Sequence, residues 1–176
     1  MKSILVWGLK KWTSKTKRMS QVKSRFTPRP YQQPIMRKFL LESVKRHLII
    51  AHRRSGKDTL SFQMLWIAAM MRPGLYYHLL PKIGQSSSVI WHGRGKDGTS
   101  FLDYIPKQLV RQVNNSTMTI TLVNGSRIKI TGADNYEALI GSNPLGIVFS
   151  EIQSTDPRAW DYLRPVLAEN EGWAVF

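Results

Sequence analysis

The feature that most constrains the fold is the run from residue 47 to residue 71, which joins an apolar segment, a glycine turn and a helical pattern. The segment "HLIIAH" (47–52) is short and apolar, which is typical of a strand buried in a parallel sheet. After Gly56 and Lys57, the segment "DTLSFQMLWIAAMM" (58–71) has a helical pattern and stops at Pro73 and Gly74. The sequence therefore predicts a strand, a tight turn and a helix in succession.

The rest of the chain alternates strand-like and helix-like segments. Two further apolar runs, 75–81 and 145–151, predict buried strands, and "GWAVF" (172–176) predicts the start of another. Helical patterns occupy 35–45, 84–91, 135–141 and 156–170. The segment "MTITLVNGSRIKITG" (118–132) predicts a β-hairpin with a two-residue turn at Asn124 and Gly125. This order predicts an α/β fold with a mainly parallel sheet, flanking helices and a hairpin.

The net charge of +15 is the most informative property of the composition. A surplus of this size favours a polyanionic partner, and the cations of residues 1–27 are not balanced by any acid. Residues 1–27 are therefore predicted to be a basic arm, which is either solvated or in contact with nucleic acid. Residues 28–176 are predicted to be one domain. The chain has no cysteine, and its longest apolar runs are far shorter than a membrane span.

The stretch "HRRSGKDTL" (52–60) resembles a phosphate-binding loop, which has Gly, four residues, Gly-Lys and then Ser or Thr. Ala51 replaces the first Gly and Asp58 replaces the hydroxyl residue. The loop at a helix N-terminus would present backbone N–H groups to phosphate, and Lys57 would add a charge on the outer phosphates. Asp58 is a possible Mg²⁺ ligand, with Thr59 acting through water. The alternative is a basic turn before an amphipathic helix.

An acidic residue follows the apolar run 145–149. Glu151 is placed to act as a general base that polarises an attacking water, which ATPases with a phosphate-binding loop require. Ser150 precedes it and brings a hydroxyl to Mg²⁺ without bringing a charge, so we expect Asp58 to supply that charge from the other side. The alternative role for Glu151 is a cap at the end of a strand.

Two further pairs of residues are candidates for contact with ATP. Arg53 and Arg54 lie in the loop, where one of them would stabilise charge on the γ-phosphate; a salt bridge or a DNA phosphate contact is the alternative. Gln32 has an amide that both donates to and accepts from the edge of adenine, and Tyr31 would pack nearby.

The segments "RPYQ", "AHRRSGKDT", "YHLLPKIGQSSSVIW", "NGSRIKITGADNYEALIGSNPLGIVFSE" and "GWAVF" together resemble the ATPase domain of the large terminase subunit of tailed bacteriophages, over about residues 28–176. The resemblance implies a P-loop NTPase fold of the RecA-like (ASCE) class and an ATPase that moves double-stranded DNA into a procapsid. It implies ATP and Mg²⁺ as cofactors. It also implies a small terminase subunit and a portal as partners, a homo-oligomeric ring when complete, and the host cytoplasm as the location.

The resemblance also assigns residues to roles. Gln32 matches the adenine-recognising Gln, while Ser150 and Glu151 match the Walker B end and the catalytic Glu. Residues Arg53 to Asp58, which include Ser55 and Gly56, match a deviant Walker A loop.

The sequence departs from the family at three places. Ser150 stands where Asp is usual, and Ile140 stands where Arg is frequent. The family also continues past the strand that ends near Phe176, into a coupling motif and a nuclease domain. We therefore expect a fold that is incomplete at its C-terminus, from a fragment or from a split or decayed gene.

Two other functions stay open. A RecA-like helicase or recombination ATPase would share the loop and Glu151 but would act on unpaired strands. A basic nucleic-acid-binding remnant with a vestigial loop would not be an enzyme.

Overall fold

The fold is a seven-stranded sheet with helices on both faces. The computed structural model describes residues 24–42 and 44–176. The strand order is β1-β7-β6-β2-β5-β4-β3. The strands from β1 to β5 in this order are parallel to one another, whereas β4 pairs antiparallel with both β5 and β3. The strands are β1 (Arg46–His47), β2 (Leu75–Leu80), β3 (Val110–Asn114), β4 (Thr119–Leu122), β5 (Arg127–Gly132), β6 (Pro144–Phe149) and β7 (Trp173–Val175).

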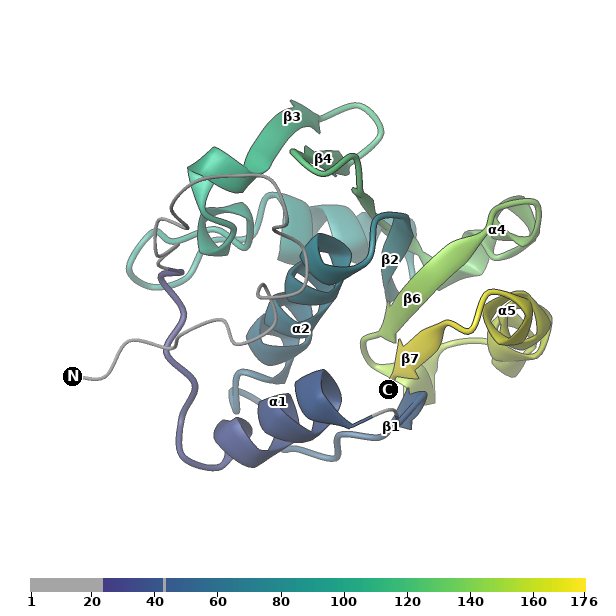
Figure 1. Cartoon of the computed structure of the whole chain (residues 1–176), viewed down its shortest axis with the longest axis horizontal. Helices are drawn as coiled ribbons and strands as arrows, with labels where there is room; N and C mark the ends of the chain where they lie inside the picture. The colour runs from purple at the N-terminus through teal and green to yellow at the C-terminus, as the bar shows by residue number, and fades with distance from the viewer. Residues whose placement is uncertain (1–23, 43) are drawn as a thin grey trace, which may run out of the picture.

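Two apolar clusters hold the helices against the sheet. Helices α1 (Gln32–Leu41) and α2 (Lys57–Met71) cover one face, where Phe62 and Leu65 of α2 are fully buried. Helices α4 (Glu137–Ile140) and α5 (Pro157–Glu169) cover the other face, where Leu163 is fully buried against β6 and β7. Figure 1 shows the two helix layers on opposite sides of the sheet. Burial on both faces explains why β2 and β6 read as continuous apolar runs.

The short connecting helices surround this frame. They are α3 (Ile83–Gln85), the π-helix η2 (Ser86–Trp91) and the 3₁₀ turns η3 (Leu102–Tyr104), η4 (Lys107–Leu109), η5 (Ala133–Asn135) and η6 (Ile152–Ser154). Within the described ranges, no helix is both long and apolar enough to cross a membrane.

Most predicted elements are confirmed, and with them the α/β fold with a mainly parallel sheet, flanking helices and a hairpin. Helix α2 covers the predicted segment 58–71, and Pro157 begins α5 as expected at a first helical turn. The predicted strands 75–81, 145–151 and 172–176 correspond to β2, β6 and β7.

The prediction of a buried strand over 47–52 was largely wrong. Only Arg46 and His47 form β1, which lies at the sheet edge and pairs with β7 alone. Leu48 and Ile50 are 69% and 90% exposed. The run is apolar, but no strand lies beside it within the described residues to cover its outer side.

The hairpin is confirmed, but its turn is longer than predicted. Leu122 and Ser126 pair across three intervening residues, and only Gly125 of the turn has a positive φ, at 88°. This is the three-residue connection in which a left-handed glycine follows a tight turn. The hairpin is also extended by β3, an edge strand that the sequence pattern did not predict.

The predicted arm lies mostly outside the described residues, which begin at Ser24. The last part of it packs on the domain: Ser24 donates a hydrogen bond to the Tyr104 carbonyl at 3.0 Å, and the Phe26 ring lies 6.3 Å from the Tyr104 ring. The division at residue 28 stays a prediction.

Candidate functional site

A pocket of about 450 Å³ opens at the carboxyl ends of β1, β6 and β7, beside the N-terminus of α2. It is lined on one side by the loop before α2 and the first turn of that helix, and on the other by the residues that follow β6. Its polar side chains are those of Arg53, Lys57, Asp58, Ser61, Ser150, Glu151, Gln153 and Ser154. Ligands of open parallel sheets characteristically bind outside the carboxyl ends of the strands.

The loop that precedes α2 turns through two left-handed residues. Arg54 has φ 62° and Gly56 has φ 78°, and the Ser55 N–H donates to the His52 carbonyl at 3.3 Å. A Cβ on Gly56 would lie 3.2 Å from Nε2 of Gln32, so both the positive φ and the close approach favour glycine here. Helix α2 begins at Lys57, immediately after this turn. The first N–H groups of α2 have no partner within the helix, as at any helix start.

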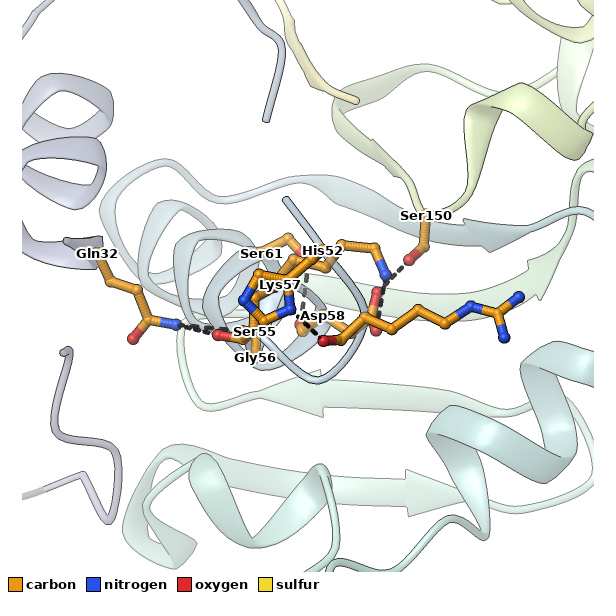
Figure 2. A network of polar contacts seen from close by, with 9 residues as sticks. Gln32, His52, Ser55, Gly56, Lys57, Asp58, Ser61 and Ser150 are labelled. Carbon is orange, nitrogen blue, oxygen red and sulfur yellow. Dashed lines mark hydrogen bonds and ion pairs between the residues drawn. The ribbon is translucent and has the colours of Figure 1, made fainter. Parts of the chain in front are cut away.

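Three polar side chains meet at the N-terminus of α2, as Figure 2 shows: those of Lys57, Asp58 and Ser150. The Ser150 hydroxyl donates a hydrogen bond to Oδ1 of Asp58, and Nζ of Lys57 lies 3.8 Å from Oδ2 of the same carboxylate. The sequence predicted that Asp58 and Ser150 face one another across a metal. The structure brings these two side chains into direct contact.

Glu151 follows Ser150 in a strained backbone conformation. Its φ is 60° and its ψ is 46°, in the left-handed region that non-glycine residues seldom occupy. The residue is exposed at the rim of the pocket. Strain of this kind concentrates at functional positions, where the surrounding structure over-determines it.

Gln32 and Tyr31 lie behind the loop and do not line the pocket. Gln32 is 2% exposed; its Nε2 donates to the carbonyls of Ser55 and Gly56 at 3.3 Å each, and its Oε1 accepts from the Arg29 N–H at 3.0 Å. The Tyr31 hydroxyl also donates to the Ser55 carbonyl, at 2.6 Å. In Figure 2, Gln32 and Ser150 approach the loop from opposite sides. Both polar atoms of the Gln32 side chain therefore form hydrogen bonds with backbone groups of this protein.

The remaining predicted residues also divide into those that line the pocket and those that do not. Arg53, Lys57, Asp58, Ser150 and Glu151 line the pocket together, whereas Arg54, Ser55, Gly56 and Thr59 belong to the same turn and helix start without lining it. Ser61 was missed by the sequence interpretation. It lies one helical turn after Lys57 and its hydroxyl donates to the Asp58 carbonyl at 3.0 Å, so helical spacing could have identified it.

The pocket fits a magnesium–nucleotide. Mg²⁺ is commonly held through one or two carboxylates together with substrate phosphates, and Asp58 and Ser150 supply the oxygen donors beside the cationic Lys57. Among the described residues there is no cluster of three or more acidic, His or Cys side chains that would hold a metal without a phosphate.

The structure resembles solved structures of phage terminases. It matches the ATPase domain of the large terminase of Thermus phage P74-26 with a TM-score of 0.65 and 16% identity, over 85% of this chain and 64% of that chain. A mutant form of the same domain matches with a TM-score of 0.63 and 17% identity, over the same shares. No protein-family model and no curated protein matches.

The similarity confirms, for the fold, the resemblance to the terminase ATPase domain. This chain spans about two thirds of the length of that domain, at 64%. Identities of 16% and 17% establish a shared fold and not a shared activity.

Proposed function

We propose that this chain is an ATP-binding and ATP-hydrolysing motor domain of a viral DNA-packaging terminase, which drives double-stranded DNA into procapsids. The observation that carries the proposal is the meeting of two distant segments in one pocket. Lys57 and Asp58 begin the helix after a glycine turn, and Ser150 and Glu151 follow the buried strand β6. A phosphate loop and an acid at the end of a nearby strand are the two parts that such a motor needs.

Each side chain has a distinct role in this proposal. The N–H groups at the start of α2 bind phosphate oxygens, which the helix dipole favours, and Lys57 contributes a positive charge to the outer phosphates. Asp58 and Ser150 would hold Mg²⁺, which when bound neutralises charge on the phosphate oxygens. Arg53 extends from the loop to the same pocket and stabilises the charge on the γ-phosphate.

Glu151 is the proposed general base. Its position at the rim, next to the Ser150–Asp58 pair, allows its carboxylate to accept a proton from the water that attacks the γ-phosphate. The strained φ of 60° fixes the direction in which this side chain leaves the strand.

The partners belong to the proposal, and the fold similarity supports them. They are double-stranded DNA, a small terminase subunit and a portal, with several copies arranged in a ring. The high positive charge of +15 supports a DNA partner.

Steady-state ATP hydrolysis tests the proposal. We expect Mg²⁺-dependent hydrolysis that duplex DNA stimulates, and we expect Glu151→Gln to lower kcat about 10²- to 10⁴-fold while ATP still binds. Glu137→Gln, on α4 outside the pocket, is the matched control. Stimulation by single-stranded DNA alone would favour a helicase, and DNA binding without nucleotide binding would favour the vestigial loop.

A further inference from the structure

One buried polar side chain beside the pocket takes no part in the chemistry proposed above for the other residues. His78 lies on β2, is 0% exposed, and has no hydrogen-bond partner for either ring nitrogen among the described residues. A buried polar group without a partner destabilises the fold, so its presence calls for a reason.

His78 faces the start of α2. On β2 it lies on the same face as Tyr76 and Leu80, which belong to the core beneath α2. Its ring lies 6.1 Å from the ring of Phe62, and Phe62 lies one helical turn after Asp58. The imidazole therefore lies beneath the first turns of α2, on the side from which Asp58 projects.

The neighbouring strand brings Ser150 to the same place. His78 is in register with Val148 on β6, and Val148 belongs to the same core. Ser150 comes two residues later, so it projects from the same face of the sheet, and its hydroxyl reaches Asp58. Three polar side chains thus lie together between the sheet and the N-terminus of α2: those of His78, Ser150 and Asp58.

The electrostatic surroundings keep the imidazole neutral. Burial lowers the pKa of His78 to about 4, and the carboxylate of Asp58 acts against this shift. Every protonation state of the ring has at least one N–H donor. Such a donor can hold a carboxylate in position.

We propose that His78 is a positioning residue for Asp58. Its ring N–H holds the carboxylate in the direction of the pocket when the Ser150 hydroxyl turns from Asp58 to the metal. Carboxylates that bind metals usually also accept hydrogen bonds from other protein groups. Loss of such a hydrogen-bond partner weakens metal binding. This inference rests on the proposed function, because Asp58 is the proposed ligand of Mg²⁺.

The first experiment compares stability with magnesium dependence. His78→Leu removes both nitrogens from an apolar site, so we expect the unfolding temperature without nucleotide to rise by about 2–4 °C. We expect the Mg²⁺ concentration for half-maximal ATP hydrolysis to rise about 10- to 100-fold, with metal-free ATP binding unchanged. His78→Asn retains an N–H donor and should recover part of the Mg²⁺ affinity.

Tyr76→Phe is the matched control, since Tyr76 lies on the same face of the same strand and its hydroxyl donates to the Arg72 carbonyl at the other end of α2. It should alter stability and leave the Mg²⁺ dependence unchanged. A His78→Leu protein with the wild-type Mg²⁺ dependence would show that His78 only fills space, provided that the wild type binds nucleotide.

A second experiment needs no ATP hydrolysis and separates this inference from the proposed function. The unfolding temperatures of His78→Leu, Asp58→Asn and the double variant, each measured with saturating Mg²⁺–ADP, form a double-mutant cycle. Shifts that fail to add, by more than about 2 °C, would support a contact between His78 and Asp58 even in a protein without ATPase activity. Shifts that add would overturn the inference, even in an active ATPase.

Discussion

At the scale of single residues, Gln32 shows how one side chain can support the loop from behind. The amide links the carbonyls of Ser55 and Gly56 to the N–H of Arg29 and is almost fully buried. The sequence suggested that Gln32 recognises adenine, and that assignment stays a prediction. The observed bonds support a role in fixing the loop backbone, on which phosphate binding depends.

Gln32→Ala distinguishes these two roles. Loss of buried hydrogen bonds should destabilise the protein by about 1–3 kcal/mol and should weaken ATP and GTP binding by similar factors, because the loop serves both nucleotides. Chemical denaturation and equilibrium binding of the two nucleotides provide the measurements, with Gln33→Ala, whose side chain is exposed, as the control. A selective loss of ATP binding would instead favour contact with adenine.

Glu151 is a second residue whose local conformation and proposed function can be separated. Glycine accepts φ 60° without strain, so Glu151→Gly should stabilise the protein by up to about 1 kcal/mol while abolishing hydrolysis. Thermal unfolding and ATP turnover should therefore change in opposite directions. A Glu151→Gly protein that is markedly less stable would show that the carboxylate makes structural contacts, and one that retains full turnover would exclude it as the base.

At the scale of elements, the hairpin turn is tied to the end of α2 that lies away from the pocket. The Asn124 amide donates to the carbonyls of Ala69 and Met70, at 2.8 and 3.3 Å, and its oxygen accepts from the Ser126 N–H at 3.1 Å. These bonds satisfy carbonyls of the last turn of α2 that have no partner within the helix. The turn therefore acts as a cap for α2.

Asn124→Ala should remove this cap and destabilise the protein by about 1–2 kcal/mol. We expect nucleotide affinity to stay within about twofold of the wild type, because the pocket lies at the opposite end of α2. Urea denaturation and ATP binding test both expectations. Asn143→Ala, at an exposed residue before β6, is the matched control and should change neither quantity.

The same turn shows the limit of sequence interpretation at this scale. The pair Asn124 and Gly125 predicted a hairpin, because the signal for a turn is local. The turn length and the bonds of Asn124 were not predictable, because they depend on α2, more than 50 residues away. For a similar reason the apolar run 47–52 could not reveal an edge position: burial depends on neighbouring strands that lie far away in the sequence.

The positions of the candidate-site residues were predictable where they follow from motif and chain order, while their roles stay predictions. The sequence placed Lys57 at a helix start and Glu151 at a strand end, and the structure brings both to one pocket. His78 was read only as part of an apolar strand. Its lack of a partner depends on the packing of α2 against β2, which no local pattern records.

At the scale of the whole molecule, charge is the property that bears on the proposed DNA partner. The net charge is +15, and residues 1–23 contribute seven cations and no acid. Contacts between cations and DNA phosphates release counterions, so the affinity falls steeply as salt rises. We therefore expect tight duplex binding at low salt, with a steep salt dependence and little sequence preference.

A variant with Lys10, Lys11 and Lys15 changed to Gln tests the contribution of the basic arm. If all three contact phosphates, the slope of log K against log salt should fall by about 2.7, since each contact contributes about 0.9. Fluorescence anisotropy with a labelled duplex at several salt concentrations measures this slope. An unchanged slope would show that the arm is only solvated, and that other basic residues make the contacts.

Equilibrium binding of Mg²⁺–ATP to the wild type and to Lys57→Ala tests whether the turn before α2 binds the phosphates of ATP. Lys96→Ala, in an exposed loop outside the pocket, is the matched control for loss of one positive charge. We expect saturable binding by the wild type and by Lys96→Ala, and at least a tenfold weaker affinity for Lys57→Ala, because its ammonium group is the point charge on the outer phosphates. Equal affinities in all three proteins, or no binding by the wild type, would contradict the account.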